Sequence, residues 1–331
     1  MPTPLLEIKD LHVWFSVFKG FLKVLDGVDF VVWPGEKVGL VGEMGCGKTT
    51  MMKAIMRILL MPPATIRKGE IFFKGRDILK MGQGQLQEIR RRKISMIFQD
   101  PTAALNPVFK IGTQLRDVIS CTRERGKSMT KGDIRRRAIQ VLKEVSLPDP
   151  ERILENYPIQ LSGGMRQRIC ISTALVSTNE LLIADEPGTS LDVTIKDQIL
   201  RLIGEVVEKR GTSVILISHS LGAVRNMTDR VYVMYAGSMV EAAKTKSLFA
   251  NPRHPYSQGL IAATPKLTGG GVGKGVPGRI PEYIDPPTGC RFHPRCEHAM
   301  PICRDKKPPF FEVNENHQVA CFLFRDNQSH R

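Results

Sequence analysis

Residues 37–50, KVGLVGEMGCGKTT, decide the fold of this chain. The apolar run at residues 38–41 predicts a short buried strand, and the glycines after it predict a tight turn that opens into a helix. Glycines let backbone N–H groups converge on a phosphate, and a lysine at the helix start can reach the outer phosphates of a nucleotide. The stretch therefore predicts a strand, a phosphate loop and a helix within an α/β core.

A chance glycine-rich turn before a helix is the alternative interpretation. It is disfavoured because glycines, lysine and threonine all stand in register between the expected strand and helix. We interpret the stretch as a nucleoside triphosphate site. The residues assigned to it are Gly42, Glu43, Gly45, Cys46, Gly47, Lys48, Thr49 and Thr50, with the Thr49 hydroxyl also a ligand of Mg²⁺.

Upstream of this loop, short apolar runs at residues 5–8 and 28–32 predict an antiparallel β region, with a turn expected at Asp26-Gly27. Several aromatic residues fall in this region, where a ring could stack on an adenine or fill the core. Phe15 is our choice for the stacking residue.

Downstream, residues 94–98 predict a buried strand that ends on Gln99, whose amide can contact Mg²⁺ or lie at the surface. Helical periodicity from residue 111 to about 176 predicts a helical insertion into the core. Near its end, LSGGMRQR starts a helix at Ser162. A serine and two glycines at a helix N-terminus can form a second anion-binding nest, or only an ordinary helix cap.

Two adjacent carboxylates follow the buried strand expected at residues 181–184. Ligands gather at the carboxyl ends of such strands, so Asp185 can hold Mg²⁺ and Glu186 can accept a proton from an attacking water. The alternative, solvated turn residues, is disfavoured by the phosphate loop upstream. His219 follows the next expected strand and can contact a γ-phosphate, or be a structural histidine.

The composition is that of a globular protein with one large or two modest domains: 331 residues, 42% of them hydrophobic. Neither a signal-like start nor an apolar run of membrane-spanning length is present, so a cytoplasmic location is expected. The formal net charge is +15, with the basic residues scattered. A solvated face and contact with a membrane surface, or with a partner embedded in it, both remain open.

Four of the seven cysteines crowd the C-terminal part with the spacing C-x5-C-x6-C-x17-C, after a glycine-rich connector at residues 269–278. So short a unit cannot bury its own core, which predicts a metal. Structural zinc usually uses tighter cysteine pairs, whereas a [4Fe–4S] cluster accepts wider spacing; unligated thiols are the third possibility. The candidate ligands are Cys290, Cys296, Cys303 and Cys321.

In chain order the motifs are GEMGCGKT, Gln99, LSGGMRQR, LLIADEP, SLD at residues 190–192 and His219. Together they resemble the nucleotide-binding subunit of ATP-binding cassette (ABC) transporters. FQDPTAALNP, NPRHPYSQGL and GCRFHPRC are similar to the oligopeptide and dipeptide importer branch of that family. The resemblance implies a P-loop NTPase core of mixed sheet and antiparallel β subdomain, an inserted helical subdomain and a small Cys-rich extension.

The resemblance also implies a head-to-tail dimer in which each ATP lies between the phosphate loop of one subunit and the nest of the other. The implied roles are as follows: Lys48 and Thr49 bind phosphates and Mg²⁺, Gln99 senses Mg²⁺ and the γ-phosphate, and Asp185 assists Mg²⁺. Glu186 is the general base and His219 the γ-phosphate clamp. Ser162, Gly163, Gly164 and Asp192 act across the dimer, and Gln167 is assigned to nucleotide binding.

The implied function is that of a peripheral ATPase at the cytoplasmic face of the membrane, energising import of di- or oligopeptides. Its implied partners are a second ATPase subunit in a heterodimer, two permease subunits and an extracytoplasmic solute-binding protein. Similar tails in this branch are associated with a [4Fe–4S] cluster, which we therefore favour over zinc. The alternatives are an importer for nickel or oligosaccharide, and a soluble ATPase acting on nucleic acid or ribosomes.

Two further expectations complete the sequence analysis. We expect an ATPase domain at residues 1–265, with a helical subdomain at about 100–177, followed by a linker and Cys-rich extension at 266–331. Cys46 stands at a helix N-terminus, so we hypothesise a lowered thiol pKa and alkylation that ATP prevents.

Overall fold

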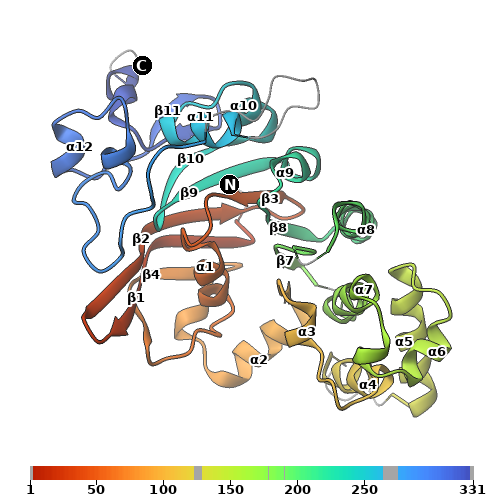
Figure 1. Cartoon of the computed structure of the whole chain (residues 1–331). Coiled ribbons are helices and arrows are strands. Elements are labelled where there is room, and N and C mark those ends of the chain that lie inside the picture. Colours follow the sequence, from red (N-terminus) through yellow and green to blue (C-terminus); the bar gives the residue numbers. More distant parts are fainter. Residues whose placement is uncertain (1–2, 123–128, 178, 190, 264–274, 329–331) are drawn as a thin grey trace. The chain divides into compact units, whose positions relative to one another are not determined.

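The computed structural model describes residues 3–122, 129–177, 179–189, 191–263 and 275–328 (Figure 1). Most of the connector expected at residues 269–278, and Ser190 of the SLD motif, lie outside these residues. The chain forms two compact units, Met1–Lys80 with Ile217–Arg331, and Met81–Leu216. Within the described residues, no helix has the combined length and apolarity that a membrane crossing requires.

The first unit contains an antiparallel sheet in the order β2-β1-β4-β5. Apolar side chains alternate along β1 and are buried on one face, at Leu6, Ile8, Leu11 and Val13, as the period of two in a half-exposed strand requires. The predicted antiparallel β region is therefore present. Its strands are β1 (Leu6–Val17), β2 (Gly20–Val32), β4 (Ala64–Phe73) and β5 (Arg76–Asp77).

The turn predicted at Asp26-Gly27 is wrong, because this pair lies inside β2. Leu11 pairs with Val28 and Val13 with Leu25, so β2 advances three residues while β1 advances two. The extra residue makes a β-bulge, and the φ of 61° at Gly27 is the left-handed conformation that glycine adopts readily. A turn-forming dipeptide thus bends a strand here instead of ending it.

A second set of strands in the first unit has the order β11-β12-β10-β9-β3. The pairing of β3 with β9 is parallel, and the other pairings are antiparallel. The predicted strand at residues 38–41 is confirmed, and its apolar side chains are fully buried. The strands are β3 (Lys37–Val41), β9 (Arg230–Tyr235), β10 (Ser238–Lys244), β11 (Phe311–Asn314) and β12 (His317–Val319).

The helices of the first unit are short. The α-helices are α1 (Lys48–Ile55), α9 (Leu221–Met227), α10 (Thr245–Ala250), α11 (Pro255–Ala262) and α12 (Ile302–Asp305). Single 3₁₀ turns occur at η1 (Ile78–Lys80) and η3 (His293–Arg295), with a longer one at η4 (Phe322–Gln328).

The second unit contains three strands in the order β8-β7-β6, with β6 and β7 parallel. β7 (Leu181–Asp185) is buried along its whole length, which fits its unbroken apolar run. The flanking strands are β6 (Ile94–Ile97) and β8 (Ser213–Ile217), whose last residue belongs to the first unit. Asp185, the last residue of β7, and Glu186 therefore lie at the end of a buried strand.

Helices make up most of the second unit (Figure 1). α4 packs against α5 and α6, and α7 packs against α3 and α5. The stretch expected to be helical, residues 111–176, contains α4 to α7, while the domain boundaries remain a prediction. The helices are α2 (Gln83–Arg92), α3 (Pro101–Ala104), α4 (Ile111–Thr122), α5 (Lys131–Glu144), α6 (Pro150–Glu155), α7 (Gly163–Ala174) and α8 (Val193–Arg210).

Local sequence explains where several of these helices begin and where α8 ends. Thr130 caps α5 through the N–H of Asp133, whose carboxylate accepts the N–H of Thr130 in return. Asp149 precedes Pro150, which is at the first position of α6. α8 ends at Gly211 with a φ of 62°, a conformation that suits glycine at a helix C-terminus.

Candidate functional site

The phosphate loop connects β3 to α1 in the first unit, and two of its glycines, Gly42 and Gly47, lie where a side chain would be crowded. A Cβ on Gly42 would lie 2.2 Å from the carbonyl oxygen of Met234, and one on Gly47 would lie 2.8 Å from Cδ2 of Leu25. Gly47 has a φ of 108°, which a side chain would strain. The sequence pattern therefore reflects backbone geometry that other residues could not adopt here.

Lys48 is held inside the loop and is only 5% exposed. Its Nζ donates hydrogen bonds to the carbonyl oxygens of Gly42, at 2.8 Å, and Glu43, at 2.9 Å. The ammonium charge is thereby fixed against the loop backbone at the N-terminus of α1, where the helix dipole also favours an anion. Thr49 and Thr50 follow in the first turn of α1 and are half-buried.

The structure corrects the hypothesis about Cys46. Its side chain is fully buried, and this burial raises the pKa of the thiol despite the neighbouring Lys48. The desolvation of a thiolate outweighs the attraction of the ammonium, whose Nζ lies 3.6 Å from the sulfur. The expected lowering of the thiol pKa is therefore wrong, whereas the response of Cys46 to alkylation is untested.

Two other predicted site residues lie in the first unit. Phe15 is half-buried on β1, paired with Leu22 of β2 and Ala64 of β4. His219 is exposed in the segment between β8 and α9. Their contacts with adenine and γ-phosphate remain predictions.

In the second unit, Gln99 and Thr189 contact Glu186, which follows Asp185 at the end of β7. Asp185 is 2% exposed and Glu186 is 8% exposed. Gln99 Nε2 donates to Glu186 Oε2 at 3.3 Å, and the Thr189 hydroxyl donates to the same oxygen at 3.1 Å. Glu186 has a φ of 50°, a left-handed conformation that is uncommon for a non-glycine residue and often occurs at functional sites.

Thr189 was not identified from the sequence. It lies just after the two carboxylates and also donates to the backbone carbonyl of Glu186, at 3.1 Å. A hydroxyl three residues after a strand-end carboxylate is typical of turns that bond back to the preceding backbone, which was the available indication. Together with Gln99, it fixes the direction in which the Glu186 carboxylate points.

The glycine nest at the start of α7 is exposed at its first residue. Ser162 is the N-cap, and its Oγ accepts the N–H of Met165 at 3.3 Å. Cβ atoms on Gly163 and Gly164 would lie 3.1 Å from Leu191 Cδ2 and 3.2 Å from Ile195 Cγ2. The helix cap that the sequence suggested is therefore present, and anion binding by the nest remains a prediction.

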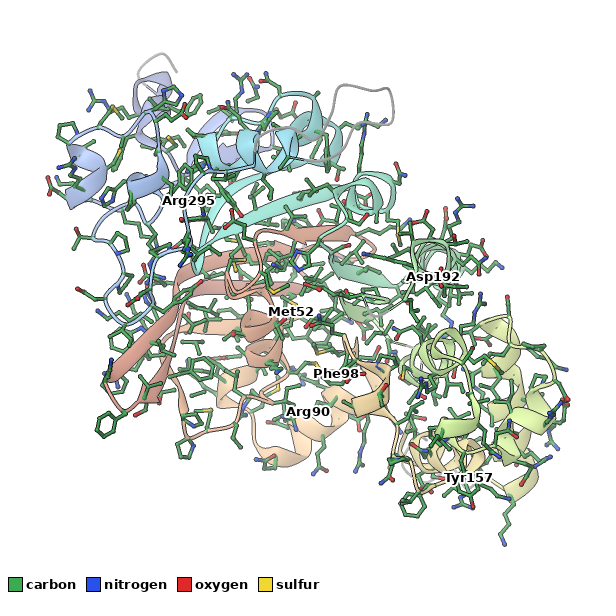
Figure 2. All side chains as sticks on the ribbon, in the orientation of Figure 1. Met52, Arg90, Phe98, Tyr157, Asp192 and Arg295 are labelled. Atoms are coloured by element: carbon green, nitrogen blue, oxygen red, sulfur yellow. The ribbon has the colours of Figure 1, made fainter. Side chains whose placement is uncertain are left out.

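Two further residues of this group differ in exposure. Gln167 is completely buried, so its predicted part in nucleotide binding, which remains a prediction, has to be indirect. Asp192, labelled in Figure 2, is exposed and caps α8, its Oδ1 accepting the N–H of Ile195 at 3.0 Å.

The four C-terminal cysteines line one small pocket, which His254 and Phe292 also line. The N–H of Cys290 donates to the carbonyl of Cys303 at 2.8 Å. Burial raises the pKa of Cys290 and of Cys321 to about 11 each. In the described part of the chain, no three His, Cys, Asp or Glu side chains are close enough to hold a metal ion, so the predicted cluster and its zinc alternative remain predictions.

Comparison with known families identifies two regions. Residues 25–189 match the family described as "ABC transporter", and residues 240–303 match "Oligopeptide/dipeptide transporter, C-terminal region". The first match spans the phosphate loop, the glycine nest and the strand-end carboxylates. The second includes Cys290, Cys296 and Cys303.

Curated relatives match over almost the whole chain. The oligopeptide transport ATP-binding protein OppD of Bacillus subtilis is 42% identical, covering 97% of this chain and 89% of the relative. The dipeptide transport ATP-binding protein DppD of the same organism is 41% identical, covering 98% and 96%. OppD of Salmonella typhimurium is 40% identical, covering 96% and 93%.

Solved structures confirm the fold. An ATP-binding cassette solved as a dimer in a post-hydrolysis state with ADP and Pi matches with a TM-score of 0.65 and 24% identity, covering 72% of this chain and 98% of that one. The protein cbiO1 of Clostridium perfringens matches with a TM-score of 0.62 and 24% identity, covering 75% and 92%. The predicted P-loop NTPase core is therefore confirmed.

Proposed function

Since the chain belongs to the ABC transporter family, among the oligopeptide and dipeptide transport ATP-binding proteins, we propose that it is the ATP-hydrolysing subunit of a membrane importer for di- or oligopeptides. The observation that carries this proposal is the buried Glu186 carboxylate, oriented by Gln99 and Thr189. A buried, oriented carboxylate suits a general base better than a structural turn residue.

In this proposal the phosphate loop binds the β- and γ-phosphates through its backbone N–H groups and Lys48. Thr49 and Asp185 hold Mg²⁺, and their hydroxyl and carboxylate oxygens are the ligands that this ion prefers. Bound Mg²⁺ neutralises charge on the phosphate oxygens. Phe15 stacks on the adenine.

Glu186 accepts the proton of the attacking water, and His219 hydrogen-bonds the γ-phosphate. The hydrogen bonds from Gln99 and Thr189 to Oε2 restrict the direction of the Glu186 carboxylate, which in this proposal orients the water. Gln99 would respond to bound Mg²⁺ and γ-phosphate and transmit that response to Glu186, because its amide contacts the Glu186 carboxylate. Loss of either donor then misorients the base without removing it.

We propose a head-to-tail dimer in which Ser162, Gly163 and Gly164 bind the γ-phosphate of ATP held by a second ATPase subunit. The exposure of Ser162 and Asp192 supports this arrangement, since both side chains are accessible to another chain. The second subunit is a related chain, in a heterodimer.

The remaining partners are two permease subunits and an extracytoplasmic solute-binding protein, with this chain bound peripherally at the cytoplasmic face of the membrane. ATP binding closes the dimer, and hydrolysis resets it. The names of the relatives favour peptides over nickel or oligosaccharide as the solute. The same names also favour a transporter subunit over an ATPase that acts on nucleic acid.

The test is ATP turnover by the Glu186→Gln variant in the complex with its permeases. We expect turnover to fall about a hundredfold or more while MgATP stays bound, because the amide keeps the shape and loses the basicity. Turnover at the parent rate would show that Glu186 is not the base. Asp192→Asn, which preserves a helix-capping oxygen, should bind ATP normally in the isolated chain.

A [4Fe–4S] cluster bound by Cys290, Cys296, Cys303 and Cys321 is a second proposal. The gathering of all four thiols around one pocket supports it, since all-cysteine ligation is typical of such clusters. Anaerobically purified protein should absorb at about 400 nm, and Cys296→Ser should lose that band. A colourless protein with stoichiometric zinc would contradict it.

A further inference from the structure

The phosphate loop receives three side chains from the C-terminal part of the first unit. These come from α11 and from the segment at residues 283–296, which includes two of the clustered cysteines. None belongs to a motif that the family resemblance assigns to nucleotide binding. Each contacts the loop on the residues that precede Lys48.

The first contact is an ion pair with two hydrogen bonds between Arg295 (Figure 2) and Glu43. The Nη1–Oε2 distance is 3.0 Å and the Nη2–Oε1 distance is 3.2 Å. The Arg295 side chain is 6% exposed and the Glu43 side chain 27%, so solvent screens this pair little. Paired guanidinium and carboxylate groups in this geometry fix both position and orientation.

The second contact joins Tyr283 to the loop backbone. The Tyr283 hydroxyl donates to the carbonyl oxygen of Gly45 at 2.8 Å. Burial raises the pKa of Tyr283, so the hydroxyl keeps its proton and remains a donor. Gly45 has a φ of 81° and no side chain that could hold its peptide by packing.

The third contact comes from Tyr256 of α11, whose hydroxyl accepts the N–H of Glu43 at 2.8 Å. Tyr256 is fully buried and packs its ring against Tyr235 and Phe292, with centroid distances of 4.7 and 5.5 Å. The N–H of Glu43 is thereby used for a protein contact. The loop is held at both ends of the tripeptide from residue 43 to 45.

The segment that supplies these contacts is itself anchored. The Arg291 guanidinium donates to the backbone carbonyls of Lys23 and Ala236, at 3.0 and 2.5 Å. The carbonyl of Tyr283 accepts the N–H of Lys23 at 2.8 Å. Contacts from an anchored segment can restrain a loop, whereas contacts from a mobile one cannot.

We propose that Arg295, Tyr283 and Tyr256 are positioning residues that hold the phosphate loop in the conformation that binds ATP. Arg295 also compensates the negative charge of Glu43, which would otherwise repel the phosphates from within the loop. The inference rests on the proposed function, because it deepens the description of that ATP site. It does not depend on whether the cysteines hold a cluster.

The test measures the Kd of a fluorescent ATP analogue for the full-length chain, and KM and kcat for ATP in the complex with its permeases. Arg295→Gln should raise Kd and KM about tenfold and change kcat less than about twofold. Tyr283→Phe, which removes one hydroxyl, should raise them about threefold. Arg279→Gln is the matched control, because Arg279 is exposed in the same part of the chain.

A double-mutant cycle isolates the ion pair. The Kd increase of the double variant Glu43→Gln with Arg295→Gln should be clearly smaller than the product of the two single increases, because the second change finds no partner to lose. Arg295→Lys should recover part of the affinity through its charge, without the paired geometry. Multiplicative effects in the cycle would overturn the pairing as the cause.

Thermal unfolding separates positioning from folding. A purely structural role would lower the Tm of Arg295→Gln and Tyr283→Phe and leave the Kd at low temperature unchanged, which would overturn the proposal. Lys48→Ala distinguishes the two levels of inference. If Lys48→Ala abolishes nucleotide binding while Arg295→Gln and Tyr283→Phe bind like the parent, only the positioning role fails. If the Lys48→Ala variant binds nucleotide normally, the proposed ATP site fails as well.

Discussion

The phosphate loop of the first unit and the glycine nest of the second are both glycine-rich helix N-termini that are predicted to bind anions, but they are built in opposite ways. The loop is buried around Lys48 and receives side chains from distant parts of its own unit. The nest at Ser162 is exposed, and its helix cap and the apolar side chains of Leu191 and Ile195 are its neighbours in the described part of the chain. In the proposed function one site is completed within the chain, and the other would present its donors to another molecule.

Removal of the Lys48 side chain should have the largest effect on nucleotide affinity. In Lys48→Ala the loop loses a charge that donates to two of its own carbonyls, and we expect nucleotide affinity of the isolated chain to fall about a hundredfold. Equilibrium binding of the fluorescent analogue measures it. Affinity within threefold of the parent would contradict a site completed within one chain.

A change at Ser162 should affect ATP turnover by the assembled complex but not ATP binding by the isolated chain. Ser162→Arg places a large side chain at an exposed position, so the isolated chain should bind ATP as the parent does. In the assembled complex, turnover should fall about thirtyfold, because the donors no longer reach the second nucleotide. If isolated chain and complex were affected equally, the nest would not serve a partner.

A smaller effect is expected from Thr189→Val, which removes the hydroxyl that donates to Glu186 Oε2. Turnover should fall about fivefold with KM unchanged, because the base loses orientation and keeps its basicity. Thr173→Val is the matched control, since that hydroxyl donates to a carbonyl within α7. An equal loss in both variants would point to a general loss of packing.

The smallest effect concerns thiol reactivity. Burial raises the pKa of Cys170 to about 12 and also raises that of Cys46, so neither forms appreciable thiolate at pH 8. Mass spectrometry after brief alkylation should find exposed Cys121 modified and these two almost unmodified. MgATP should not change the labelling of Cys46, and strong protection by MgATP would restore the low-pKa hypothesis.

Sequence predicted those parts of the molecule that depend on neighbours along the chain. The phosphate loop and the carboxylates after β7 are local patterns, and the structure places them at the start of α1 and the end of β7 as expected. The cap at Ser162 follows equally from local rules. The order of the sequence patterns also predicted a helical stretch between the strands now identified as β6 and β7.

Predictions failed where tertiary surroundings override local chemistry. Asp26-Gly27 forms a bulge because β1 lies beside it, and Cys46 keeps its proton because the fold buries it. The contacts of Arg295 and Tyr283 with the loop join residues 252 and 238 positions apart, which no local pattern encodes. Thr189 was missed because its partner lies at a strand end whose backbone conformation the sequence does not reveal.

Those sequence separations have a consequence for synthesis. The phosphate loop leaves the ribosome long before Tyr283 and Arg295 have been translated, so a nascent chain carries the complete motif without the residues that shape it. Under the proposed positioning role, full affinity for ATP would be acquired late, when the last quarter of the polypeptide folds onto the phosphate loop. Truncated translation products would contain the nucleotide motif and bind nucleotide more weakly than full-length subunits.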